Sequence, residues 1–222
     1  MDLMARYPDN FFDLAIVDPP YFSGPEKRKY YGAEKSTYGI KRREYNRQDL
    51  VWQVPGPDYF KELFRVSKHQ IIWGCNYFDF NAGSGRIIWD KINYNNSFSD
   101  CEIAYCSLHD SVRIFRFMWN GMMQGKSIKE GWIMRGDKTK NQFRIHPTEK
   151  PIELYHWQLM KYAKPGFKIL DTHLGSASIA IACFDLGFDL TGSEISASYF
   201  ELSMARLEQY KLKKIQNIEF SF

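Results

Sequence analysis

The chain has 222 residues, of which 44% are hydrophobic and 17% aromatic, and its net charge is +4 at pH 7. This length favours one α/β domain with a substantial core and leaves no room for two large domains. The sequence has neither an apolar run of about eighteen residues nor a basic start followed by an apolar core, so we expect no membrane helix, no secretory signal and a cytoplasmic protein.

Apolar runs of strand length alternate with helical patterns in the first half of the chain. Residues 13–17 indicate a buried strand, and residues 58–68 an amphipathic helix. Further strands are predicted at 70–73, 86–89 and 101–106.

The second half begins with a break in this pattern, because residues 107–144 are polar, contain glycine and are typical of an insertion. Strands are then predicted at 167–170 and 188–191, and helices at 151–163, 178–186 and 197–212. This alternation predicts an α/β fold with a mostly parallel sheet that helices cover on both faces.

Positive charge is concentrated in two segments, 25–47 and 107–144, each with eight Lys or Arg against three acidic residues. Aromatic residues are interleaved with these charges, which favours a surface that binds nucleic acid over two solvated loops, although solvated loops remain an alternative. The candidate DNA-binding residues are Lys41, Arg42, Arg43, Arg113, Arg116, Lys126, Arg135, Lys138 and Lys140.

The first motif is the turn Asp18-Pro19-Pro20-Tyr21, which directly follows the first predicted strand. Active sites of open α/β sheets gather at the carboxyl ends of strands. The two prolines remove two N–H donors, so the turn offers mainly acceptors, which suits the amine of an aromatic base, and Tyr21 can stack on that base. The alternative is an ordinary turn in which the prolines end the strand.

The second motif is the loop of residues 171–178, DTHLGSAS, between a predicted strand and a helix. Its small residues let a ligand approach the backbone, and Asp171 would attract an ammonium group. Glu194 follows the next strand, where a carboxylate can hold two ribose hydroxyls or, alternatively, interact with a helix N-terminus. Together they suit an adenosine with an amino-acid tail.

The segment His146-Pro147-Thr148-Glu149-Lys150-Pro151 precedes a predicted helix. Thr148 or Glu149 can cap that helix, with Pro151 in its first turn. Lys150 can instead pair with the carboxylate of a ligand.

In this order, DPPY, a basic region, HPTEKP, DTHLGSAS and GSE resemble the β class of amino-DNA methyltransferases, in which the catalytic motif precedes the cofactor motif. The resemblance covers nearly the whole chain. It implies that Asp18, Pro19, Pro20 and Tyr21 form the catalytic turn. It implies that S-adenosyl-L-methionine is bound by Asp171, His173, Leu174, Gly175, Ser176, Glu194, His146, Thr148 and Lys150.

The chain departs from this family in two places. The family usually has Asp-Pro-Phe and a second glycine in the cofactor loop, whereas Thr172, His173 and Ala177 stand here, and we expect His173 to stack on the ligand. The family also has a strand ending in Gly-Asp before the segment that matches residues 1–10. We expect that edge strand to be absent.

The resemblance therefore predicts a Rossmann-like methyltransferase fold with a seven-strand-type sheet and circularly permuted motifs. Its parts are a catalytic half (1–106), a target-recognition insertion (107–144) and a cofactor half (145–222). The expected reaction is direct methyl transfer to N6 of a flipped adenine in double-stranded DNA.

Several alternatives remain. N4 of cytosine is the first, although the family's cytosine members more often have Ser in place of Asp18. A catalytically impaired DNA-binding homologue is another, whereas protein and RNA methyltransferases with a similar turn usually place the cofactor loop first. The recognition sequence, a homodimer and an accompanying restriction nuclease are left open.

A metal site is not expected. The four cysteines form no CxxC pair, and the five histidines share no ligand spacing with them. This pattern favours reduced thiols.

Overall fold

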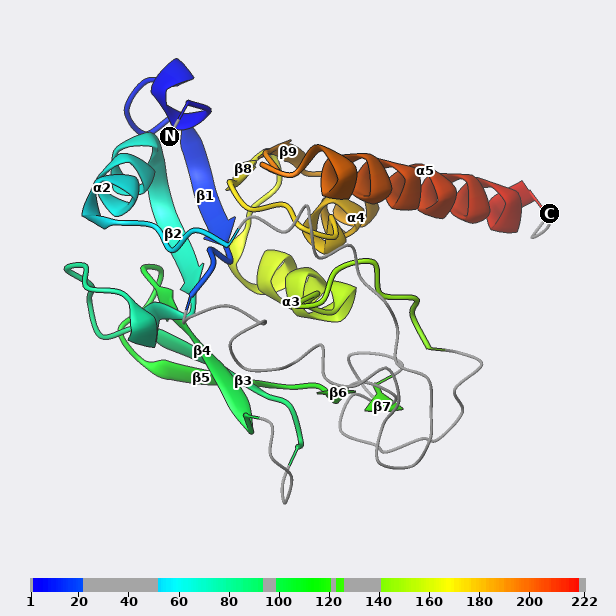
Figure 1. The fold of residues 1–222 in the computed structure, drawn as a ribbon, viewed down its shortest axis with the longest axis horizontal. Coiled ribbons are helices and arrows are strands. Elements are labelled where there is room, and N and C mark those ends of the chain that lie inside the picture. The colour runs from blue at the N-terminus through cyan, green and yellow to red at the C-terminus, as the bar shows by residue number, and fades with distance from the viewer. Residues whose placement is uncertain (1, 22–51, 94–98, 121–122, 126–140, 220–222) are drawn as a thin grey trace.

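The computed structural model describes residues 2–21, 52–93, 99–120, 123–125 and 141–219 (Figure 1). The first half contains a short 3-10 helix (Met4–Arg6), strand β1 (Phe12–Val17), helix α2 (Pro57–Val66), β2 (Ser67–Trp73), a second 3-10 turn (Cys75–Tyr77), β3 (Arg86–Asp90) and β4 (Cys101–Cys106). The second half contains β5 (Val112–Arg116), β6 (Trp119–Asn120), β7 (Met123–Gln124), α3 (Ile152–Tyr162), β8 (Lys168–Asp171), α4 (Ser178–Leu186), β9 (Asp189–Gly192) and α5 (Ala197–Glu219).

Within the described ranges, seven strands form one sheet in the order β5-β3-β4-β2-β1-β8-β9, and β6 and β7 form a separate pair. Among these seven strands only β4 runs antiparallel to its neighbours, so the expected mostly parallel α/β sheet is confirmed. β1 lies between β2 and β8, with Leu14 opposite both His69 and Ile169. The halves of the chain before and after the predicted insertion therefore meet at the centre of the sheet.

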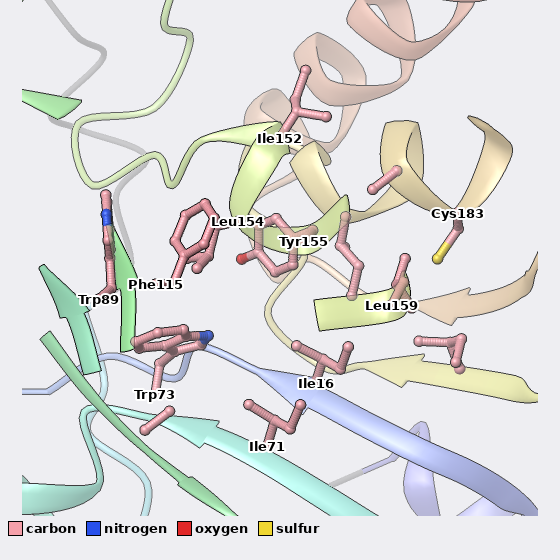
Figure 2. Packing of buried hydrophobic residues seen from close by; sticks show 14 of the residues in the cluster. Ile16, Ile71, Trp73, Trp89, Phe115, Ile152, Leu154, Tyr155, Leu159 and Cys183 are labelled. Atoms are coloured by element: carbon pink, nitrogen blue, oxygen red, sulfur yellow. The ribbon is translucent and has the colours of Figure 1, made fainter. Parts of the chain in front are cut away.

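Residues of the central strands alternate between the two faces of the sheet, as the period of a strand requires. Leu14, Ile16 and Ile71 pack with α3 and α4 on one face. Figure 2 shows Ile16, Ile71 and Trp73 facing Leu154, Tyr155 and Leu159 of α3. Ala15, Val17, Ile72 and Leu170 pack with α2 on the other face. Both faces are therefore covered.

The structure differs from the sequence predictions at several boundaries. Helix α2 ends at Val66, because Ser67 already pairs with Phe12 in the first register position of β2. Helix α5 continues to Glu219, and it extends beyond the sheet in Figure 1. Strand β9 stands at the end of the sheet opposite β5, where it pairs with β8 and with no other described strand.

Residues 107–144 are not a single insertion outside the sheet. Their first part forms β5, which pairs in parallel with β3 from Val112 to Arg116 and makes one edge of the main sheet. The β-branched and aromatic residues Val112, Ile114 and Phe115 favour a strand, but they do not alternate strictly with the charged residues. The polar residues around them weaken this local signal.

Candidate active site

A cavity of about 880 Å³ opens where the parallel strands β1, β8 and β9 end. Because these strands are neighbours and point the same way, Asp18, Asp171 and Glu194 come to the same edge. The cavity is lined by every catalytic and cofactor residue predicted from the sequence except Asp171, which lies behind its wall: Asp18, Pro19, Pro20, Tyr21, His146, Thr148, Lys150, His173, Leu174, Gly175, Ser176 and Glu194.

The carboxylate of Asp18 has two different environments. Its Oδ2 accepts a hydrogen bond from the ammonium of Lys150. Its Oδ1 is buried and has no hydrogen-bond partner in the described part of the chain. Pro19 and Pro20 have no N–H with which to reach it. The turn therefore presents one buried acceptor that remains available.

Tyr21 is held at both its hydroxyl and its ring. Its hydroxyl donates to Glu102 Oε2 at 3.0 Å, and its ring stacks on Tyr77 with centroids 4.9 Å apart and planes 12° apart. Gly74 lies against this ring at φ +68°, and a Cβ on Gly74 would come within 2.3 Å of Tyr21 Cδ1. A glycine is therefore required both for the backbone conformation and for the space that Tyr21 occupies.

From the sequence, Lys150 could pair with the carboxylate of a ligand, but in the structure it pairs with carboxylates of the protein itself. It is 3% exposed, and its Nζ lies between Asp18 and Glu102 Oε2, the latter at 3.0 Å. Glu102 Oε1 also pairs with Lys91 Nζ at 2.5 Å. Sequence reasoning missed Glu102 and Lys91, although a single glutamate in the otherwise uncharged strand 101–106 was a signal.

Burial and charge act together on this group. Burial raises the pKa of Asp18, and Lys150 offsets this only in part. Burial would also raise the pKa of Glu102, but Lys150 and Lys91 lower it below the usual value. The pKa of Lys150 is raised because its two carboxylate partners outweigh burial. Lys150 and Glu102 are therefore a charged pair beside Asp18.

The cofactor loop places a buried carboxyl group behind the cavity wall. Asp171 Oδ1 accepts the N–H of His173 at 2.9 Å. Burial raises the pKa of Asp171 to about 8 despite this bond, and the negative charges of Asp18 and Glu194 add to the rise. Tyr59 of α2 contacts Thr172 Oγ1 at 2.7 Å and fixes the loop from the other side.

Glu194 connects this loop to the next helix. Its Oε2 accepts the N–H of Gly175 at 2.8 Å, and its Oε1 accepts the N–H of Ser196 at 3.0 Å, just before α5 begins. The sequence left two roles open for Glu194, a contact with ribose hydroxyls and an interaction with a helix N-terminus, and the structure is compatible with both. The carboxylate lies at a helix N-terminus and also lines the cavity.

Four residues of the segment 146–151 line the cavity (His146, Thr148, Glu149 and Lys150), and the capping of α3 by Thr148 or Glu149, one alternative drawn from the sequence, does not occur. Pro151 is the N-cap residue of α3, and no side chain caps this end. Thr148 Oγ1 instead contacts His146 Nδ1 at 3.1 Å, and Glu149 pairs with Arg206 at 3.0 Å. Burial lowers the pKa of His146 to about 4, and the charge of Lys150 adds to this.

Two of the nine candidate DNA-binding residues lie in the described structure. Arg113 and Arg116 are exposed on the edge strand β5, and Arg116 Nε is 3.3 Å from Asp90 Oδ2. The others lie outside the described residues: Lys41, Arg42, Arg43, Lys126, Arg135, Lys138 and Lys140.

The described ranges contain neither a metal-ligand group nor a membrane-spanning helix. Within them, no three His, Cys, Asp or Glu side chains are grouped as metal ligands. No helix in these ranges is both long and apolar enough to cross a bilayer.

Comparison with solved structures supports the fold. The protein TTHA0409 of Thermus thermophilus, crystallised with S-adenosyl-L-methionine, matches with a TM-score of 0.52 and 16% identity, over 94% of this chain and 90% of that one. The PvuII DNA methyltransferase, which is cytosine-N4-specific, matches with a TM-score of 0.51 and 12% identity, over 94% and 86%. These likenesses confirm the Rossmann-like methyltransferase fold.

Comparison of sequences gives the family. The Type II methyltransferase M.HpaI of Haemophilus parainfluenzae is 24% identical over 232 residues, which cover 90% of this chain and 69% of that protein. The profile of the N6/N4 methyltransferases, described as DNA methylase, matches residues 89–205. Because this match covers more than half of the chain, the protein belongs to the N6/N4 DNA methylase family.

Proposed function

We propose that this DNA methyltransferase transfers a methyl group from S-adenosyl-L-methionine to N6 of adenine in double-stranded DNA. The observation that carries the proposal is Asp18 Oδ1, a buried oxygen with no partner in the described structure. Buried acceptors are nearly always satisfied, so this oxygen favours a ligand that donates a hydrogen bond. The exocyclic amine of adenine is such a donor.

The cavity has the groups that this cofactor requires. Its volume of about 880 Å³ lies within the usual range for ligand sites. Glu194, which lines the cavity, offers carboxylate oxygens for ribose hydroxyls. Asp171 lies behind the cavity wall, so its charge would act on a bound ammonium group through the loop and not by direct contact. Gly175, at φ +53°, leaves backbone space beside them. When bound, S-adenosyl-L-methionine supplies an electrophilic methyl carbon on a sulfonium.

Asp18 activates the target in this mechanism. An aromatic amine is a poor nucleophile because its lone pair is delocalised into the ring. A hydrogen bond to Asp18 Oδ1 orients the amine and favours a more tetrahedral nitrogen. This nitrogen would take the methyl group of the bound cofactor, and the methylated amine would give up one proton. Asp18, whose pKa is raised by burial, is placed to accept this proton.

The other residues of the site hold Asp18 and the base. Lys150 binds Oδ2 and leaves Oδ1 free for the amine. Tyr21 offers an aromatic ring against which a flipped base can pack. No covalent intermediate with the protein is needed. The choice of adenine over cytosine rests on Asp18, since the cytosine members of the family more often have Ser at this position.

The test uses the purified protein, S-adenosyl-L-methionine labelled in its methyl group, and duplex DNA of mixed sequence. We expect the cofactor to bind in calorimetry and the label to enter adenine. Cofactor binding without labelled DNA would support a catalytically impaired homologue. Label in cytosine alone would replace adenine N6 with cytosine N4.

A further inference from the structure

Glu102 reaches the active site from the antiparallel strand of the sheet. Trp73, the last residue of β2, lies opposite Ala104 of β4. Because β4 runs the opposite way, Glu102 lies two residues beyond this pair, at the edge where β1 and β2 end. The direction of β4 therefore places a carboxylate where the parallel strands place the catalytic turn.

This carboxylate contacts three groups of the site at once. Glu102 Oε2 accepts from the hydroxyl of Tyr21 and pairs with Lys150 Nζ, both at 3.0 Å. Glu102 Oε1 pairs with Lys91 Nζ at 2.5 Å. Lys150 in turn binds Asp18. One side chain is therefore connected directly to Tyr21 and, through Lys150, to Asp18.

We propose that Glu102 is a positioning residue for methyl transfer, which holds Tyr21 and Lys150 so that Asp18 Oδ1 faces the target amine. This inference rests on the proposed function. Glu102 does not touch the substrate in this account. It acts through the two residues that do contact the base or fix the catalytic carboxylate.

The charges of the group explain why a carboxylate is needed at this position. Asp18 and Glu102 carry two negative charges, and Lys150 and Lys91 carry two positive charges. Lys150 is only 3% exposed, so the loss of a charged partner would leave its ammonium group poorly compensated. Without the charge of Glu102, Lys150 would keep Asp18 as its one charged partner among the described residues, and Tyr21 would lose a charged acceptor. Both changes would disturb the geometry of the turn.

The same chemistry occurs far from the site and supplies a matched control. Asp185 of α4 is 10% exposed, pairs with Lys214, and accepts from the hydroxyl of Tyr210 at 2.6 Å. Like Glu102, it is a carboxylate that accepts from a tyrosine and pairs with two basic side chains, the second being His156 of α3 at 3.0 Å. It connects α4 to α5 and does not line the cavity. Asp185→Asn therefore tests the general cost of removing such a carboxylate.

The experiment compares wild type, Glu102→Gln and Asp185→Asn by steady-state methyl transfer to duplex DNA. We expect Glu102→Gln to lower kcat by about tenfold to a hundredfold, with KM for DNA and for S-adenosyl-L-methionine within about threefold of wild type. Asp185→Asn should keep kcat within about twofold. A kcat of Glu102→Gln equal to that of Asp185→Asn would overturn the inference, as would a change confined to KM.

The variant Tyr21→Phe provides a second test, which can be carried out even if Glu102→Gln does not fold. It keeps the aromatic ring and removes only the hydroxyl that Glu102 accepts. We expect kcat to fall by about threefold to tenfold, with little further loss when both changes are combined. An unchanged kcat in Tyr21→Phe, or fully multiplicative losses, would contradict the inference. An inactive wild type would instead reject the proposed function itself.

Discussion

Asp18 and Asp171 show how similar residues at one sheet edge acquire different properties. Asp18 has a cationic partner in Lys150, whereas Asp171 Oδ1 accepts the N–H of His173 and the nearby acids raise its pKa further. Asp18 thus keeps one oxygen for the amine, and Asp171 is most stable in its neutral form until a cation arrives. Both environments follow from burial at the carboxyl ends of neighbouring strands.

Asp18→Ala separates catalysis from binding. It removes the one carboxylate of the turn, and Pro19 and Pro20 have no side-chain acceptor that could replace it. We expect the single-turnover rate at saturating cofactor to fall at least about a hundredfold, which corresponds to roughly 2.7 kcal/mol in barrier. Duplex DNA should still bind, since phosphate contacts dominate affinity.

The matched control for this variant lies on β1, the strand that leads to Asp18. Asp13 pairs with Lys68 at 2.7 Å at the amino end of β1, away from the cavity. Asp13→Ala should keep a near-normal rate. If Asp18→Ala keeps one as well, Asp18 is only a structural turn residue and the mechanism is wrong.

The variant Asp171→Asn tests how much folding stability the protein loses by burying a carboxyl group at the cofactor loop. Burial raises the pKa of Asp171 to about 8, whereas an unfolded chain has about 3.9. The folded state therefore holds the proton more tightly, and this group's contribution to stability is present at about pH 4 and is lost as the pH rises to about 8.

Asparagine stays neutral and can still accept the N–H of His173. In the absence of cofactor, we expect the variant to melt above wild type at pH 8 by roughly 2–4 °C for each kcal/mol recovered. The difference should shrink toward pH 5, and cofactor affinity should fall. Thermal melts at both pH values test this, and an increase that does not depend on pH would contradict it.

Strand β5 carries Arg113 and Arg116, the two candidate DNA-binding residues that lie in the described structure. It is an edge strand, and it displays Arg113 and Arg116 to solvent. The sequence indicated their positive charge but assigned 107–144 to a single insertion. The β-branched and aromatic residues of 112–116 favour a strand, but the pairing of this strand with β3 depends on contacts far apart in the chain.

Removing both arginines should weaken DNA binding mainly at low salt. If each releases one counterion, the slope of log K against log salt in Arg113→Ala/Arg116→Ala becomes shallower by up to about 2. Lys211→Ala/Lys213→Ala on α5 is the matched control and should leave the slope unchanged. Titrations at several salt concentrations measure both. An unchanged slope in the β5 variant would show that this strand does not face DNA.

At the scale of the whole molecule, the site exists because two distant parts of the chain meet at the centre of one sheet. Asp18 and Lys150 are 132 residues apart, and they meet where β1 lies beside β8. The motifs and their order were enough to predict the fold class and twelve of the residues that line the cavity, because strands that end in acidic turns collect at one edge.

The partners of these residues were not predictable in the same way. The pairing of Lys150 with Glu102 depends on the antiparallel direction of β4, which no local pattern specifies. The stacking of Tyr21 on Tyr77 likewise depends on the turn at Gly74. These contacts join segments far apart in the chain, so they appear only when the sheet order is known.

The most direct test of adenine N6 methylation is mass spectrometry of nucleosides from the DNA of cells that express the protein. Cells that express wild type should gain N6-methyladenine, and cells that express Asp18→Ala at the same level should not. Sequencing of the modified bases would then show whether they share one recognition sequence. DNA that gains only N4-methylcytosine, or no methylated base at all, would contradict the account.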